Sequence, residues 1–114
     1  HIITNGFELT QATKLRCSGL EGLFDHVITS EGAGAGKPDP RIFAKALKLA
    51  KAEAAESLMI GDSITADMDG ARAVGMDQVH FASEGNGDPL ATFRIRRIGE
   101  LSAWLGTRTA SSDR

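Results

Sequence analysis

Ser-Leu-Met-Ile-Gly-Asp-Ser at residues 57–63 is an apolar run that ends in a polar turn. A run of this kind is typical of a buried strand, and the segment after it is predicted to be a helix that ends at Gly75. The predicted strands are 1–4, 26–30, 57–61, 77–82 and 92–98, and the predicted helices are 7–18, 40–51, 64–74 and 100–105. This alternation predicts an α/β fold, with a doubly wound, mostly parallel, Rossmann-like sheet and helices on both faces.

The segments between these elements are rich in turn-forming residues. Residues 20–24 are predicted to form a short helical turn, and residues 31–40 a loop rich in Gly and Pro, in which Asp39 caps the next helix. We predict one domain over residues 1–105. The polar segment 106–114 lacks periodicity and is expected to be a disordered tail.

The composition excludes several classes of function. The chain has 114 residues, 41% of them hydrophobic, and 13 Lys and Arg against 15 Asp and Glu give a net charge of −2. Such a charge provides no basic surface for nucleic acid, and no apolar stretch is long enough to cross a membrane. A single cysteine, Cys17, cannot form an internal disulfide, so we expect a cytoplasmic location.

Carboxylates follow the strand at 57–61. Asp62 comes directly after that strand and Asp67 lies where the next helix starts. Two carboxylates beside a helix N-terminus suit Mg²⁺, which takes one or two protein carboxylates and shares its other positions with water and phosphate. The alternative is that Asp62 is an N-cap and Asp67 interacts with the helix dipole.

Two other loops predict a site for an anionic oxygen. Thr4-Asn5-Gly6 offers a hydroxyl and backbone N–H groups just before a helix, although Asn-Gly after a strand is often only a turn. Lys37 lies in a turn stiffened by proline, from which its ammonium could neutralise phosphate; the alternative is a solvated surface lysine. The loops that follow parallel strands meet at one edge of a sheet, where ligands bind.

Other candidate residues carry no catalytic signal. The glycines before Lys37 lack the spacing of a nucleotide phosphate loop. His1, His26 and His80 are scattered along the sequence without ligand spacing and are interpreted as structural. Cys17 is placed on the apolar face of its helix, so we expect it in the core.

The order of these motifs resembles the haloacid dehalogenase superfamily of hydrolases. The segments that carry the resemblance are Ile-Ile-Thr-Asn-Gly-Phe, Gly-Lys-Pro-Asp-Pro-x-Ile-Phe and Ile-Gly-Asp-Ser-x-x-x-Asp-x-x-Gly-Ala, within residues 2–82. Among subfamilies, the chain is most similar to bacterial phosphatases with a helical cap, of the pyrimidine 5′-nucleotidase type. The resemblance implies that the substrate is a small phosphorylated metabolite.

The resemblance also implies a role for each candidate residue. Thr4 would bind the transferring phosphoryl group through its hydroxyl, assisted by the backbone of Asn5. Lys37 would orient the nucleophile and offset charge. Asp62 would help to coordinate Mg²⁺, and Asp67 would support the metal shell. An Asp carboxylate would attack phosphorus, and a second Asp would protonate the leaving group.

The sequence departs from the family pattern in one respect. The family's first motif, a strand that ends in Asp-x-Asp, is absent from this sequence, as is the cap inserted after that strand. We therefore expect this chain alone to be inactive. The absent strand would lie between the strands that end at Thr4 and Gly61, so these two strands should stand about 9.6 Å apart and remain unpaired. The missing segment or another copy of the chain would complete the sheet.

The parent protein is accordingly predicted to be a Mg²⁺-dependent phosphomonoesterase. One alternative is a haloacid dehalogenase, which uses the same nucleophile without metal; the two carboxylates Asp62 and Asp67 argue against it. The other is a non-catalytic phosphate-binding or assembly module.

Overall fold

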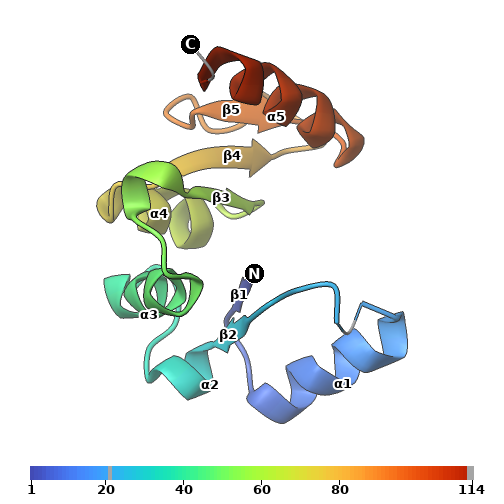
Figure 1. The fold of residues 1–114 in the computed structure, drawn as a ribbon, viewed down its shortest axis with the longest axis vertical. Helices are drawn as coiled ribbons and strands as arrows, with labels where there is room; N and C mark the ends of the chain where they lie inside the picture. The colour runs from blue at the N-terminus through green and yellow to red at the C-terminus, as the bar shows by residue number, and fades with distance from the viewer. Residues whose placement is uncertain (21, 113–114) are drawn as a thin grey trace.

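Five short parallel strands form two separate sheets in the computed structural model, which describes residues 1–20 and 22–112 (Figure 1). One sheet has the order β1-β2 and the other the order β3-β4-β5. The strands are β1 (Ile2–Thr4), β2 (Val27–Thr29), β3 (Leu58–Gly61), β4 (Asp77–Phe81) and β5 (Phe93–Ile95). Every pair within these sheets is parallel, as the sequence predicts.

Helical segments connect the first four strands, a loop joins β4 to β5, and a last helix follows β5. The helical segments are α1 (Glu8–Ser18), α2 (Ser30–Ala33), α3 (Pro40–Ala50), the 3₁₀ turn η1 (Ala54–Glu56), the π-helical η2 (Ile64–Asp69), α4 (Gly70–Ala73) and α5 (Gly99–Ser112). The predicted α/β class is confirmed, and the arrangement is that of a partial Rossmann-like core. Among the described residues, no helix is long and apolar enough to cross a membrane.

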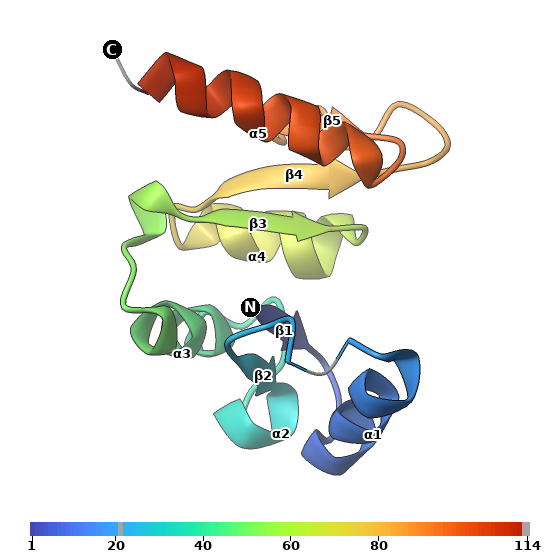
Figure 2. The ribbon, with the colours of Figure 1, turned by 45° about the vertical axis from the view of Figure 1, so that its right-hand side comes forward.

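The two sheets face each other across an open slot. β1 pairs only with β2, and β3 only with β4, in the part of the chain that the structure describes. Figure 2 shows β1 and β3 on opposite sides of this opening. This slot is a cavity of about 490 Å³, and residues of β1, β3 and α3 line it. The expectation that the strands ending at Thr4 and Gly61 do not pair is confirmed.

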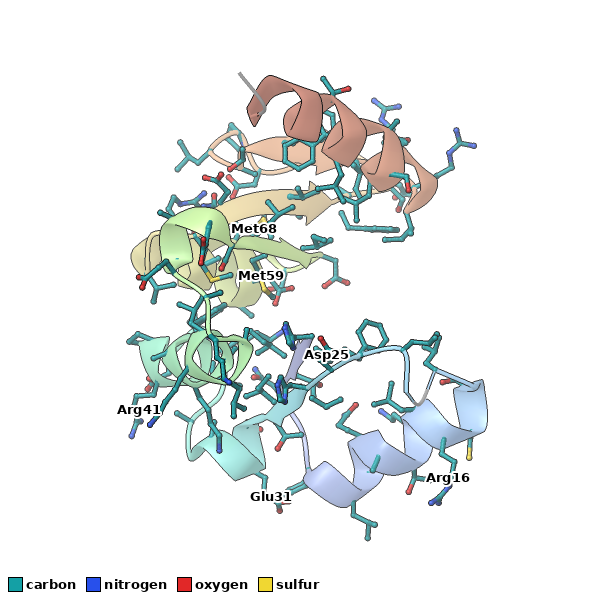
Figure 3. All side chains as sticks on the ribbon, in the orientation of Figure 1. Arg16, Asp25, Glu31, Arg41, Met59 and Met68 are labelled. Carbon is teal, nitrogen blue, oxygen red and sulfur yellow. The ribbon has the colours of Figure 1, made fainter. Side chains whose placement is uncertain are left out.

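Helix α3 joins the two sheets. Asp39 caps its N-terminus by accepting the backbone N–H of Arg41 at 2.9 Å, and Pro40 occupies the first turn. Ile42 and Phe43 are fully buried on its inner face. The main core cluster draws on both sheets and on the helices between them: it contains Ile28, Ile42, Phe43, Met59, Ala71 and Met76. Figure 3 shows the side chain of Met59 in this layer, whereas Arg41 points outward.

Two helical segments differ from the sequence prediction near the site. Part of the loop predicted at 31–40 is the short helix α2, because Thr29 caps it by accepting the Gly32 N–H at 3.0 Å. The helix predicted at 64–74 begins instead with a π-helical stretch before α4. Ser63 starts this stretch, since its hydroxyl accepts the Ala66 N–H at 3.0 Å.

The last helix and the cysteine also differ from the prediction. Helix α5 runs through residues 106–112, where an irregular tail was expected, because this segment contains no proline and continues the helix; residues 113–114 lie outside the described residues. Trp104 of this helix stacks on Phe93 of β5, with ring centroids 4.9 Å apart. Cys17 is exposed rather than in the core, because α1 packs few of its side chains against the sheet.

Candidate functional site

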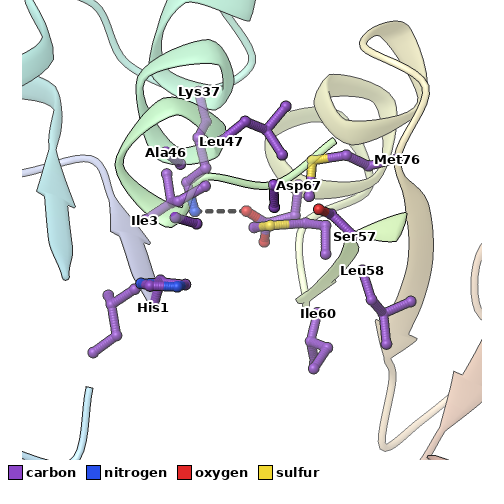
Figure 4. Close-up of a pocket in the computed structure, with 14 residues that line it drawn as sticks. His1, Ile3, Lys37, Ala46, Leu47, Ser57, Leu58, Ile60, Asp67 and Met76 are labelled. Carbon is purple, nitrogen blue, oxygen red and sulfur yellow. Dashed lines mark hydrogen bonds and ion pairs between the residues drawn. The ribbon is translucent and has the colours of Figure 1, made fainter. Parts of the chain in front are cut away.

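A buried ion pair lies at one end of the slot. The Lys37 ammonium is 2.6 Å from Oδ1 of Asp67, and these side chains are only 13% and 5% exposed. Both residues line the cavity between β1 and β3, and the dashed line in Figure 4 marks the pair. Two residues that follow different predicted strands are therefore in direct contact. The alternative of a solvated surface lysine at Lys37 is wrong.

Asn5 fixes the backbone of the lysine loop. Its amide nitrogen donates to the Lys37 carbonyl at 3.1 Å, and its amide oxygen accepts the Lys37 N–H at 2.7 Å. Gly36 permits this approach, because a Cβ there would lie 2.9 Å from the Asn5 amide oxygen. Asn5 thus does more than form a turn: it links the end of β1 to the loop that carries the ammonium group.

Gly6 and Thr4 occupy the same end of the first sheet. The Gly6 carbonyl accepts the Ser30 hydroxyl at 3.1 Å and the Glu31 N–H at 3.3 Å, which ties this loop to the start of α2. Thr4 is half-buried at the last position of β1, in register with Thr29. Their predicted contacts with phosphate stay predictions.

Asp67 organises the turn that follows β3. Its Oδ2 accepts the Ser63 N–H at 3.1 Å, while its Oδ1 binds Lys37. A Cβ on Gly61 would overlap the Asp67 carboxylate, so glycine is required at the end of β3. Both oxygens of Asp67 are engaged, and this side chain acts on the geometry of the turn and on the position of Lys37.

Asp62 is the carboxylate that remains available for a cation. It is exposed and follows the end of β3, five residues before Asp67 in the sequence. No group of three or more His, Cys, Asp or Glu residues in the described chain is arranged to hold a metal ion. Since Mg²⁺ takes only one or two protein carboxylates, Asp62 fits it as one ligand, with the other positions left to water and to groups from outside this chain.

His80 and Asp88 were not among the predicted site residues, and His80 was interpreted as structural. His80 is 4% exposed, and its Nε2 lies 3.0 Å from the Asp62 carbonyl. Asp88 accepts the Leu90 N–H at 2.9 Å, and this bond, with the Arg72 guanidinium, holds the pKa of the Asp88 carboxyl below its usual range. The sequence signal for His80 was its place between Val79 and Phe81, near the carboxyl end of a predicted strand. No sequence signal pointed to Asp88.

Comparison with known proteins identifies the family. A family model described as "Hydrolase: haloacid dehalogenase-like hydrolase" matches residues 1–75. The chain belongs to this family. It is 44% identical over 80 residues to a glyceraldehyde 3-phosphate phosphatase of Pyrococcus abyssi, a match that covers 70% of this chain and 34% of that protein.

Solved structures of the family share the fold. The magnesium-bound putative HAD-hydrolase YfnB of Bacillus subtilis superimposes with a TM-score of 0.85 at 34% identity, covering 91% of this chain and 47% of that one. A 2-haloacid dehalogenase of Pseudomonas syringae pv. Tomato has a TM-score of 0.74 at 30% identity, covering 82% and 42%. The chain therefore spans less than half the length of these relatives.

Proposed function

We propose that this chain carries the phosphate-binding and cation-binding part of a Mg²⁺-dependent phosphohydrolase that acts on small phosphomonoesters. The buried Lys37–Asp67 pair at the end of the slot is the observation that carries this proposal. A lysine with one partner and 13% exposure keeps donors for a phosphate oxygen, and the low-dielectric surroundings strengthen that attraction. The phosphatase among the relatives supports the same reaction class.

The open slot offers a place for the strand that would carry the nucleophile. Unpaired strand edges bind another strand readily. The carboxyl ends of both edge strands meet at Lys37, through Asn5 after β1 and through Asp67 beside Gly61 of β3. The cavity is lined largely by apolar side chains, such as Ile3, Leu47 and Met59. These features favour an apolar parallel strand as the occupant, and its carboxyl end would lie beside Lys37. A strand that ends in Asp-x-Asp would place a nucleophile there.

The proposed reaction needs few groups from this chain. A carboxylate of the added strand attacks phosphorus and displaces the alcohol, which takes a proton from the second Asp; water then cleaves the acyl phosphate and releases phosphate. Lys37 offsets the phosphoryl charge, and Thr4 and the backbone of residues 5–6 donate to its oxygens. Bound Mg²⁺ would supply further charge stabilisation, with Asp62 as a ligand.

A complementation experiment tests this function. The chain is mixed with a short apolar peptide that ends in Asp-x-Asp, and hydrolysis of p-nitrophenyl phosphate is followed with and without Mg²⁺. We expect no turnover by the chain alone and Mg²⁺-dependent turnover by the mixture. The matched controls are a peptide with Asn in place of the first Asp and the chain variant Lys37→Met, both of which should abolish turnover.

Other outcomes separate the alternatives. A mixture that binds the peptide but shows no turnover contradicts the proposed function and supports a phosphate-binding module. Release of halide from a 2-haloacid that survives a chelator supports the dehalogenase reaction, which a structural neighbour is named for. Assembly of the chain with itself in preference to the peptide identifies a second copy as the occupant. Selective hydrolysis of nucleoside 5′-monophosphates would support the nucleotidase subtype.

A further inference from the structure

The peptide group between Asp62 and Ser63 is held at both of its polar atoms. Its N–H donates to Oδ2 of Asp67 at 3.1 Å, and its carbonyl lies 3.0 Å from Nε2 of His80. The two partners come from different elements, η2 and β4. Fixing both atoms fixes the plane of the peptide and the position of the Asp62 Cα in it, so the Asp62 side chain leaves the backbone from a fixed point.

The hydrogen bonds of His80 determine its tautomer. The backbone N–H of Asp88 donates to Nδ1 at 2.8 Å, so Nδ1 carries no proton. The proton of the neutral ring is then on Nε2, which donates it to the Asp62 carbonyl. If Nδ1 also carried a proton, its N–H would face the Asp88 N–H, and two donors cannot form a hydrogen bond with each other. The buried imidazole therefore forms two hydrogen bonds to the backbone: Nδ1 accepts from Asp88, and Nε2 donates to Asp62.

The loop after β4 is built to reach this imidazole. Gly87 has φ +73°, and a Cβ there would lie 3.2 Å from Nδ1 of His80 and 3.0 Å from Cγ of Arg94. Glycine thus allows the Asp88 N–H to approach the ring. The Asp88 carboxylate in turn binds Arg72 of α4 at 3.1 Å, which anchors the loop. Gly87 and the Arg72–Asp88 ion pair thus hold the Asp88 N–H against the His80 ring.

We propose that His80, as the neutral Nε2–H tautomer between the Asp88 N–H and the Asp62 carbonyl, is a positioning residue that orients Asp62 for cation binding. This inference rests on the proposed function, because it assumes that the Asp62 carboxylate is a cation ligand. Groups behind a metal ligand commonly set metal affinity by holding the ligand in one orientation.

The test compares three chains by NMR: the unaltered chain, His80→Phe and His80→Gln. Phenylalanine keeps most of the ring volume without either hydrogen bond, whereas the Gln amide can accept from Asp88 and donate to Asp62. MgCl₂ is titrated and the Asp62 amide shift is followed. We expect His80→Phe to raise the half-saturating Mg²⁺ concentration about 10-fold or more, and His80→Gln to restore most of the affinity.

Two further measurements separate positioning from mere packing. The imidazole ¹⁵N shifts of the unaltered chain should show His80 as the Nε2–H tautomer, a measurement that needs no variant to fold. His26→Gln is the matched control, because it makes the same chemical change at the start of the neighbouring sheet, where His26 stacks on His1. It should leave the Mg²⁺ titration unchanged.

The outcomes distinguish this inference from the function on which it rests. If the unaltered chain shows no Mg²⁺ response at Asp62, the cation site is overturned together with the role of His80. If the chain responds and His80→Phe responds with equal affinity, the positioning role alone is overturned. An Nδ1–H tautomer would also overturn it.

Discussion

Helices α1 and α3 have the same length of 11 residues but very different surroundings. Helix α3 begins with an Asp cap and a proline and buries Ile42 and Phe43 completely. Helix α1 has no side-chain cap, and Leu9 on it is 80% exposed. The apolar residues of α3 lie on one face, whereas those of α1 are spread around the helix, so the two helices differ already in sequence pattern.

The two helices also differ in their position relative to the slot. Helix α3 contacts β1, β2, α2 and α4, so it packs against elements on both sides of the opening. Figure 1 shows α1 at the margin of the molecule, beyond the first sheet. The stability of the chain is therefore expected to depend on α3 and its neighbours, and much less on α1.

The largest effect is expected from Phe43→Ala. Removal of a fully buried aromatic side chain at the junction of the two sheets should lower the free energy of unfolding by about 4 kcal/mol. The matched substitution Leu9→Ala on α1 should change it by less than about 0.5 kcal/mol. Urea unfolding of both variants measures the two values. Equal losses would contradict the difference between the helices.

A smaller but still large loss is expected from Lys37→Met. This change leaves the Asp67 carboxylate buried with only the Ser63 N–H, and breaking a buried pair in this way costs about 3 kcal/mol. The double variant Lys37→Met with Asp67→Asn should regain part of that loss, since no buried charge remains. Lys45→Met, which removes an exposed bond to the Gly32 carbonyl, is the control. A Lys37→Met variant as stable as this control would contradict the buried pair.

The second sheet should also show a dependence on acid that comes from Asp88. The Leu90 N–H, followed by the Arg72 guanidinium, lowers the pKa of this carboxyl below 3.8 in the folded state. Its contribution to stability is complete above pH 3.8 and is lost as the pH falls through the lowered pKa. The stability difference between the unaltered chain and Asp88→Asn should therefore shrink below that pH. A constant difference in acid unfolding curves would contradict this.

The smallest effect is expected at Cys17. This residue is exposed on α1, so Cys17→Ser should change the free energy of unfolding by less than about 0.5 kcal/mol. The thiol of the unaltered chain should react with a thiol reagent at the rate of an unfolded peptide. Slow reaction under native conditions would show that α1 packs more tightly than the structure indicates.

The fold was predictable where local signals and tertiary contacts agree. Asp39 and Pro40 predicted the start of α3, and the apolar runs predicted all five strands. The exposure of α1 was predicted wrongly, because its apolar residues do not share one face and Cys17 therefore had no core-facing side to lie on. Helix α2 was missed because its cap, Thr29, is also the last residue of a strand.

The sequence predicted which residues belong to the candidate site, but not the hydrogen bonds among them. The sequence placed Asn5, Lys37 and Asp67 in loops at one edge of the sheet, and the structure connects them through hydrogen bonds. The role of the Asn5 side chain and the two bonds of His80 were missed, because they join segments far apart in the sequence to backbone atoms. No residue pattern specifies such contacts.

Hydrogen exchange at the edges of the slot tests whether the sheet is open between β1 and β3. The Ile2 N–H donates to the His26 carbonyl at 2.9 Å, and alternation along a parallel strand directs the next amide, that of Ile3, into the slot. Amides of β4, which is paired on both sides, should be the most protected. We expect the Ile3 amide to exchange much faster than the Ile2 amide and to slow when the Asp-x-Asp peptide is added. Equal protection of both amides in the chain alone would show that the sheet is already closed and would contradict the account.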